Sequence, residues 1–226
     1  MPVVVKSDWR RRFGPARDQG GRPTCLAFAA SDAHAALRAP WIALSCEFAF
    51  YHAQRRAGRA PTTGALLPAM LTALKSDGQP VETDWPYLET LPTDLGMYGP
   101  PGALQVFRRN SETRADVLDE IIVMLEAGQS SLLLMMISDA FYTPDTEGIV
   151  RASTGEAPDP GRRHAVVAVG HGDVDGARAI LVRNSWGADW GFGGHAWLPE
   201  AFLVPRLTRV ALLMEEINVP AQNLAA

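Results

Sequence analysis

The sequence predicts an α+β protein in which helices come first and an antiparallel sheet follows. Two observations lead to this class. The first half contains alanine-rich and leucine-rich segments whose apolar residues recur at helical spacing. The second half contains short apolar runs bounded by turn residues, which is typical of strands.

Four segments have the composition or periodicity of helices. They are residues 25–38, 45–57, 64–77 and 113–127. Thr24 and Ser45 precede the first two segments and are expected N-caps, since their hydroxyls can accept a free backbone N–H. Gly78 and Gly128 follow the last two segments and are expected stops.

Five later segments are predicted strands of an antiparallel sheet or barrel. They are residues 131–137, 164–170, 178–183, 195–198 and 207–213. The proline- and glycine-rich stretch 91–102 is interpreted as an ordered connector between two lobes, and 143–163 as a long loop. We therefore expect one domain, 1–226, with a mainly helical lobe at about 8–108, a mainly β lobe at about 109–213 and a tail at 214–226.

Composition excludes several classes of function. The formal net charge of -4 argues against nucleic acid as a partner, because phosphate binding needs a positive surface. No apolar run is long enough for a signal peptide or a membrane span. Scattered histidines and two distant cysteines give no zinc spacing, and no glycine-rich phosphate loop is present, so no metal or cofactor is expected. We expect a cytoplasmic protein.

Cys25 is the candidate nucleophile. It falls in the first turn of a predicted helix, where partial positive charge and free N–H groups favour a thiolate. Gln19 lies six residues earlier, before the flexible pair Gly20 and Gly21. Its side-chain amide and the backbone N–H of Cys25 can converge as two donors to an oxyanion.

His164 is the candidate base, because an imidazole can take the thiol proton near neutral pH. Asn184 follows a predicted strand, where its amide can hold His164 in one tautomer. Trp186 can shield that contact from water. His34, His52, His171 and His195 are interpreted as structural or solvated.

Three segments resemble motif blocks of papain-like cysteine peptidases, and they come in the family's order. The glutamine–cysteine block is RDQGGRPTCLAFAA, the histidine block is HAVVAVGHG and the asparagine block is RNSWGADWGFGGHAWL. The resemblance runs from about Ser7 to about Leu213. It implies a papain-like fold with a helical left lobe, a β-barrel right lobe and a cleft between them. It also implies a thiol protease that hydrolyses a protein or peptide substrate through an acyl-enzyme.

The resemblance carries roles to particular residues. Cys25 would be the nucleophile, His164 the base, Asn184 its orienting partner and Gln19 the oxyanion donor. Gly64, Leu67, Pro68 and Trp186 would be the substrate-binding residues.

Several positions depart from the family pattern. Arg22 and Pro23 stand where the family usually has a cysteine and a glycine, so a disulfide is missing. Leu26 replaces a tryptophan, and the glycine pair that binds substrate backbone is not intact, since Ala65 and Leu66 follow Gly64. The resemblance begins about where a mature enzyme of the family begins, so we expect an enzyme without a prosegment. We expect the peptidase activity to be restrained in another way: by a narrow substrate range, by an inhibitor or immunity protein, or by export into a target cell.

Two other functions remain open. The same triad can pass the acyl group to an amine or cleave an isopeptide, and a prosegment-free enzyme of this kind can serve as a toxin or effector inside a target cell. A papain-like shell can also act as a binding module without catalysis.

Overall fold

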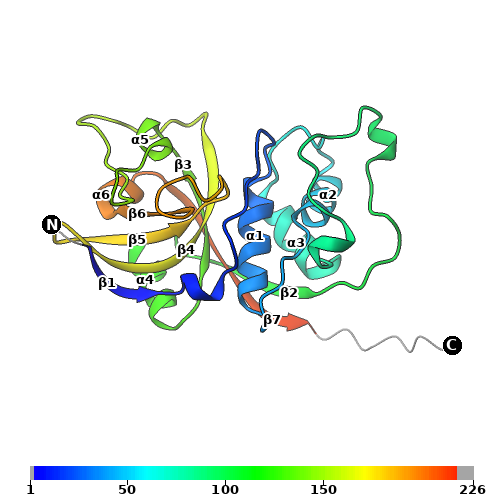
Figure 1. Cartoon of the computed structure of the whole chain (residues 1–226), viewed down its shortest axis with the longest axis horizontal. Coiled ribbons are helices and arrows are strands. Elements are labelled where there is room, and N and C mark those ends of the chain that lie inside the picture. The colour runs from blue at the N-terminus through cyan, green and yellow to red at the C-terminus, as the bar shows by residue number, and fades with distance from the viewer. Residues whose placement is uncertain (1–2, 218–226) are drawn as a thin grey trace.

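The computed structural model describes residues 3–217 as two lobes that lie side by side (Figure 1). The helical lobe contains α1 (Cys25–Ala36), α2 (Cys46–Ala57) and α3 (Leu67–Ser76). The sheet lobe contains the strands together with α4 (Leu118–Glu126), α5 (Asp139–Tyr142) and α6 (Glu200–Leu203). Three short 3-10 helices lie in connecting segments, at Arg10–Arg12, Glu82–Asp84 and Leu95–Met97.

Within residues 3–217, seven strands form one antiparallel sheet. They are β1 (Val4–Asp8), β2 (Arg108–Arg114), β3 (Ser131–Met136), β4 (Arg163–Val174), β5 (Ala177–Arg183), β6 (His195–Pro199) and β7 (Leu207–Ile217). The order is β2-β7-β3-β4-β5-β6, and β1 pairs with β4. This confirms the predicted helix-then-sheet order.

The two faces of the sheet bury different cores. On one face Leu132, Val167 and Leu181 pack with the helical lobe. On the other face Leu133 and Val166 pack with residues of α4 and α6. Neighbouring residues of a strand point to opposite faces of the sheet. A strand that is buried on both faces therefore needs apolar residues at successive positions, and this explains the unbroken apolar run in β3.

The helix ends follow the predicted capping residues in most cases. The Ser45 hydroxyl accepts the N–H of Phe48 at 3.0 Å. Gly78 and Gly128 adopt left-handed φ angles of 78° and 77° after α3 and α4. Thr24 occupies the N-cap of α1 but makes no capping hydrogen bond, since its hydroxyl lies 3.0 Å from that of Tyr87 instead.

Two predicted segments differ from the structure, and two strands, β1 and β2, were not predicted. The predicted helix 113–127 begins only at Leu118, because Thr113 and Arg114 belong to β2. The sequence did not predict β2, RRNSETR, since an edge strand needs no apolar face. The tail predicted from 214 is still β7 as far as Ile217, and the rest of it lies outside the described residues.

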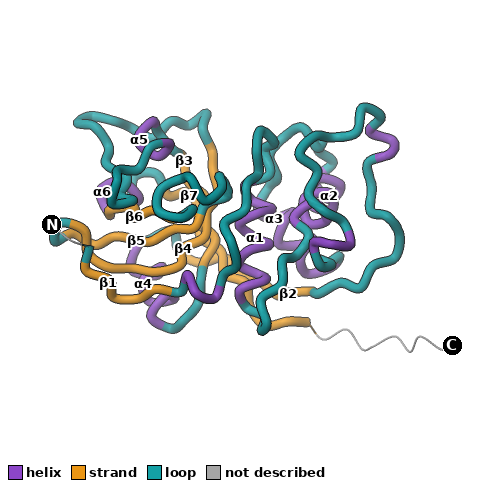
Figure 2. The backbone as a smooth tube through the Cα atoms, in the orientation of Figure 1, coloured by secondary structure: helices purple, strands orange, loops and turns teal. Residues whose placement is uncertain are grey.

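The connector predicted at 91–102 follows the outer side of the helical lobe before the chain enters β2 (Figure 2). Among residues 3–217, no helix has both the length and the apolar composition that crossing a membrane requires.

Candidate active site

Cys25 is the first residue of α1 and carries a partly exposed free thiol. The backbone N–H of Ala165, the residue after His164 on β4, lies near enough to the sulfur to lower the pKa of the Cys25 thiol. Packing of α1 on β4 therefore brings the two predicted reactive segments together across the lobe boundary.

His164 and Asn184 form a direct hydrogen bond. Nε2 of His164 donates to Oδ1 of Asn184 at 2.7 Å, and the N–H of Ser185 donates to the same oxygen at 2.8 Å. Asn184 directly follows β5 and is only 2% exposed. The bond fixes the orientation of the imidazole and leaves Nδ1 as the ring nitrogen for another partner.

An aromatic cluster encloses this pair. The Trp186 ring lies 4.7 Å from the His164 ring, centroid to centroid, as the sequence analysis predicts. Phe141, fully buried, lies 5.6 Å from the same imidazole, and Tyr142 stacks on Trp186 at 5.1 Å. Phe141 and Tyr142 were not identified from sequence, although two adjacent aromatic residues soon after an apolar strand are a usable signal.

The side-chain amide of Gln19 is held at both ends. Its Oε1 accepts the Ser185 hydroxyl at 2.7 Å, and its Nε2 donates to the Arg22 carbonyl at 2.8 Å. The Tyr87 hydroxyl donates to the Gln19 carbonyl at 2.7 Å. One Nε2 hydrogen remains for a further acceptor. Ser185 and Tyr87 were not identified from sequence.

Burial shifts both titrating groups toward their neutral forms. It raises the pKa of the Cys25 thiol above its usual 9.0, an effect larger than the opposing hydrogen bonds from the N–H groups of Ala165, Leu26 and Cys25. It lowers the pKa of His164 from 6.5 to about 4, against the opposing bond to Asn184. The hydrogen bonds at the start of the helix lower the Cys25 pKa as expected, but burial outweighs them, so the structure favours the neutral forms of both groups.

The four substrate-binding candidates lie in different surroundings. A Cβ added at Gly64 would lie 4.0 Å from the Pro23 carbonyl, so this glycine flanks the turn before Cys25. Leu67 is 6% exposed and packs in the core of the helical lobe, whereas Pro68 is exposed. Leu66, at 47% exposure, is the accessible apolar side chain of this segment. Trp186 is half-buried against His164.

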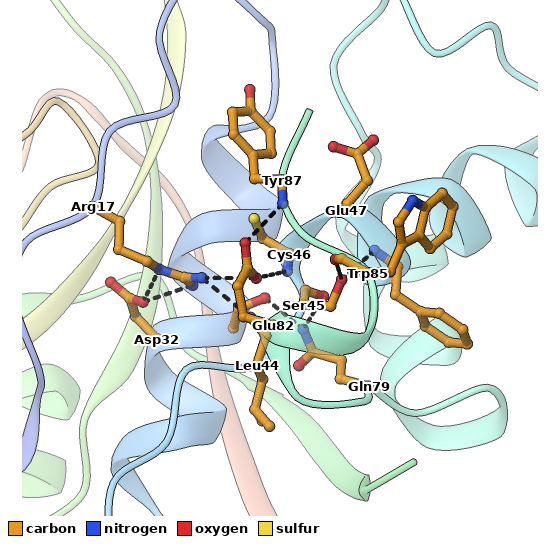
Figure 3. Close-up of polar contacts among 12 residues, drawn as sticks. Arg17, Asp32, Leu44, Ser45, Cys46, Glu47, Gln79, Glu82, Trp85 and Tyr87 are labelled. Atoms are coloured by element: carbon orange, nitrogen blue, oxygen red, sulfur yellow. Dashed lines mark hydrogen bonds and ion pairs between the residues drawn. The ribbon is translucent and has the colours of Figure 1, made fainter. Parts of the chain in front are cut away.

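A buried carboxylate links the segments that carry these residues. Asp32 of α1 accepts Nε of Arg17 at 2.9 Å and Nε of Arg183 at 2.6 Å. Arg17 also contacts Glu82 at 3.3 Å, as Figure 3 shows. Arg17 is two residues before Gln19, and Arg183 directly precedes Asn184. One carboxylate thus connects the Gln19 segment, the Cys25 helix and the Asn184 strand.

The family model for papain family cysteine proteases matches residues 64–201, more than half of the chain. The chain belongs to the papain family of cysteine proteases. The matched range includes His164 and Asn184 but not Gln19 or Cys25.

Two curated proteins illustrate the similarity. Cysteine proteinase 1 of Entamoeba histolytica is 25% identical over 200 residues, which are 83% of this chain and 61% of that protein. Cathepsin K of Gallus gallus is 27% identical over 206 residues, which are 87% of this chain and 58% of that protein. The chain therefore spans about three fifths of the length of these relatives.

Solved structures of cysteine proteases share the fold. Xylellain from Xylella fastidiosa superimposes with a TM-score of 0.73 at 21% identity, over 94% of this chain and 85% of that one. A Carica candamarcensis cysteine protease in complex with E-64 gives a TM-score of 0.70 at 20% identity, over 95% of this chain and 99% of that one. The predicted papain-like two-lobe fold is confirmed.

Proposed function

We propose that this chain is a cysteine peptidase that hydrolyses peptide bonds in a protein or peptide substrate. The observation that carries the proposal is the 2.7 Å bond between His164 Nε2 and Asn184 Oδ1. The residue after His164, Ala165, has a backbone N–H that lowers the pKa of the Cys25 thiol, so the base and the nucleophile belong to neighbouring segments. Family membership supports the same chemistry.

In the first half-reaction, Nδ1 of His164 takes the thiol proton and the Cys25 sulfur attacks the scissile carbonyl carbon. Nε2 of Gln19 and the N–H of Cys25 donate to the oxyanion. The imidazolium gives its proton to the leaving amine as the C–N bond breaks, and an acyl-enzyme remains. His164 then deprotonates a water that attacks the thioester, and the Cys25 thiol is released.

The test is turnover of a fluorogenic peptide library by the wild type and by Cys25→Ala, with folding checked by circular dichroism. We expect turnover to disappear in Cys25→Ala and to persist in the control Cys46→Ala, since Cys46 is completely buried in α2. Equal turnover by wild type and Cys25→Ala would overturn the assignment.

An epoxide thiol inhibitor separates the peptidase from a binding module. We expect stoichiometric labelling of the wild type at Cys25 and none in His164→Ala. Equal labelling of both proteins would favour a papain-like shell without catalysis.

Acyl transfer is a second candidate, motivated by the altered glycine pair, since Ala65 and Leu66 follow Gly64. Mass spectrometry of products with added amine distinguishes the two reactions. Exclusively hydrolysed product would eliminate transfer.

A further inference from the structure

Glu47, the second residue of α2, carries a buried carboxylate outside the catalytic site. Its exposure is 0%. Arg22 donates to both carboxylate oxygens, at 2.6 and 2.9 Å, and the Tyr98 hydroxyl donates to Oε1 at 2.5 Å. The N–H of Leu88 donates to Oε2 at 3.0 Å. Figure 3 shows Glu47 directed away from Arg17 and Asp32, so it forms an ionic centre separate from theirs.

This centre connects to the proposed oxyanion donor through the backbone of Arg22. While the Arg22 guanidinium binds Glu47, the Arg22 carbonyl accepts Nε2 of Gln19 at 2.8 Å and the N–H of Thr24 at 2.9 Å. A displacement of Arg22 therefore moves the acceptor that orients the Gln19 amide and changes the turn into Cys25.

The turn between Gln19 and Arg22 has little rigidity of its own. Gly20 adopts a φ of 56°, and a Cβ added at Gly20 or Gly21 would meet no atom within 4 Å. Glycine backbone has wide conformational freedom, so the order of this turn depends on side-chain anchors, one of which is the Asp18 carboxylate that accepts the Gly20 N–H at 2.8 Å. The Arg22 side chain, only 8% exposed, is such an anchor, and its charge needs a buried partner.

We propose that Glu47 is a positioning residue for oxyanion stabilisation, acting through Arg22 on the side-chain amide of Gln19. This inference rests on the proposed peptidase function. Arg22 stands at a position where papain-like enzymes usually have a disulfide cysteine, and both cysteines of this chain are free. The ion pair thus anchors the nucleophile turn without a covalent bridge.

Two reactions of Cys25 separate positioning from general folding. Amide hydrolysis needs the oxyanion donors. Alkylation by iodoacetamide forms a C–S bond as the C–I bond breaks, with no oxyanion on a carbonyl, so it needs only the activated thiol. A positioning role therefore predicts slower hydrolysis at an unchanged alkylation rate.

The experiment measures kcat, KM and the iodoacetamide inactivation rate for wild type, Glu47→Gln and Tyr98→Phe. Loss of one oxyanion donor slows kcat by roughly 10²–10³-fold, and displacing a donor should have a smaller effect. On that scale we expect kcat to fall about tenfold in Glu47→Gln and about threefold in Tyr98→Phe. KM and the alkylation rate should stay within about twofold of wild type.

Tyr51→Phe is the matched control. The rings of Tyr51 and Tyr98 pack against each other, with centroids 5.3 Å apart. The Tyr51 hydroxyl, however, accepts a hydrogen bond from Arg55 and makes none to Glu47. It should match wild type in both reactions. If Glu47→Gln does not fold, the kcat and alkylation rate of Tyr98→Phe test the inference in its place.

Two results would overturn the inference: an unchanged kcat in the folded variants, or equal slowing of hydrolysis and alkylation. A wild type that neither hydrolyses peptides nor reacts rapidly with iodoacetamide would instead refute the proposed function itself.

Discussion

The two lobes hold their reactive residues by different means. In the helical lobe, buried charged side chains anchor the structure around Cys25: Asp32 is 3% exposed and Glu47 is 0% exposed. In the sheet lobe, His164 pairs with Met135 in the β3–β4 ladder and lies beneath aromatic rings.

The difference follows from backbone structure. His164 lies on a strand and Asn184 directly follows one, so repeating backbone hydrogen bonds help to fix both. Gln19 precedes a glycine turn, and its segment has an isolated bridge, between Asp18 and Trp186, in which the Gln19 N–H donates to the Ser185 carbonyl at 2.9 Å. Side chains must therefore supply more of the order there than in a strand. Four substitutions test this contrast, from the largest expected effect on stability to the smallest.

Asp32→Ala should have the largest effect. It leaves the guanidinium groups of Arg17 and Arg183 without the carboxylate that joins them, and loss of one partner from a buried ion pair costs about 3–5 kcal/mol. Denaturant unfolding measures the change. The control Asp119→Ala, whose carboxylate pairs with Arg178 at the surface, should be nearly neutral. Equal losses of unfolding free energy in Asp32→Ala and Asp119→Ala would contradict the view that buried charges anchor the helical lobe.

Leu133→Ala tests the apolar core of the sheet lobe. Leu133 is fully buried between the sheet and α4, and truncating such a side chain costs about 3 kcal/mol through lost burial and a cavity. The same unfolding experiment measures it, and Val123→Ala, at an exposed position of α4, is the control. A loss below about 1 kcal/mol would mean that the core collapses around the deletion.

Acidification should destabilise the fold through its buried histidines. Burial lowers the pKa of His34 from 6.5 to about 3, so the folded state stays neutral while the unfolded state gains a proton below pH 6.5. Stability from this group is therefore complete above its unfolded pKa and falls as pH drops from 6.5 toward 3.

Unfolding curves at pH 7 and pH 5 test this linkage. Between these values His34 should account for about 2 kcal/mol of the lost stability. His34→Gln should therefore lose less stability than wild type over the same interval. Parallel pH profiles for the two proteins would show that His34 does not contribute.

Ser45→Ala should have the smallest effect, about 1–2 kcal/mol, because it removes the N-cap of α2 and the hydrogen bond from the Ser45 hydroxyl to the Trp85 carbonyl. Thermal unfolding measures it against Ser76→Ala, an exposed serine in the last turn of α3. A change no larger than that of Ser76→Ala would show that the cap is dispensable.

Much of the fold could be predicted from local patterns. Apolar periodicity predicted helices α1, α2 and α3 and strands β3 to β7, and glycine, proline and capping residues indicated where these elements end. Strands β1 and β2 could not be predicted in this way, since the VVKSD and RRNSETR segments have no buried face that would produce an alternating pattern.

The sequence alone determined the order of helices and strands, the family, and the residue types available for thiol chemistry. Tertiary structure decided which distant groups meet: the Cys25 sulfur beside Ala165, Ser185 on the amide of Gln19, and Glu47 beneath Arg22. It also decided that burial outweighs the helix-end effect on the Cys25 pKa. Local propensity depends on neighbours along the chain, whereas desolvation and ion pairing depend on neighbours in space, which a linear pattern does not encode.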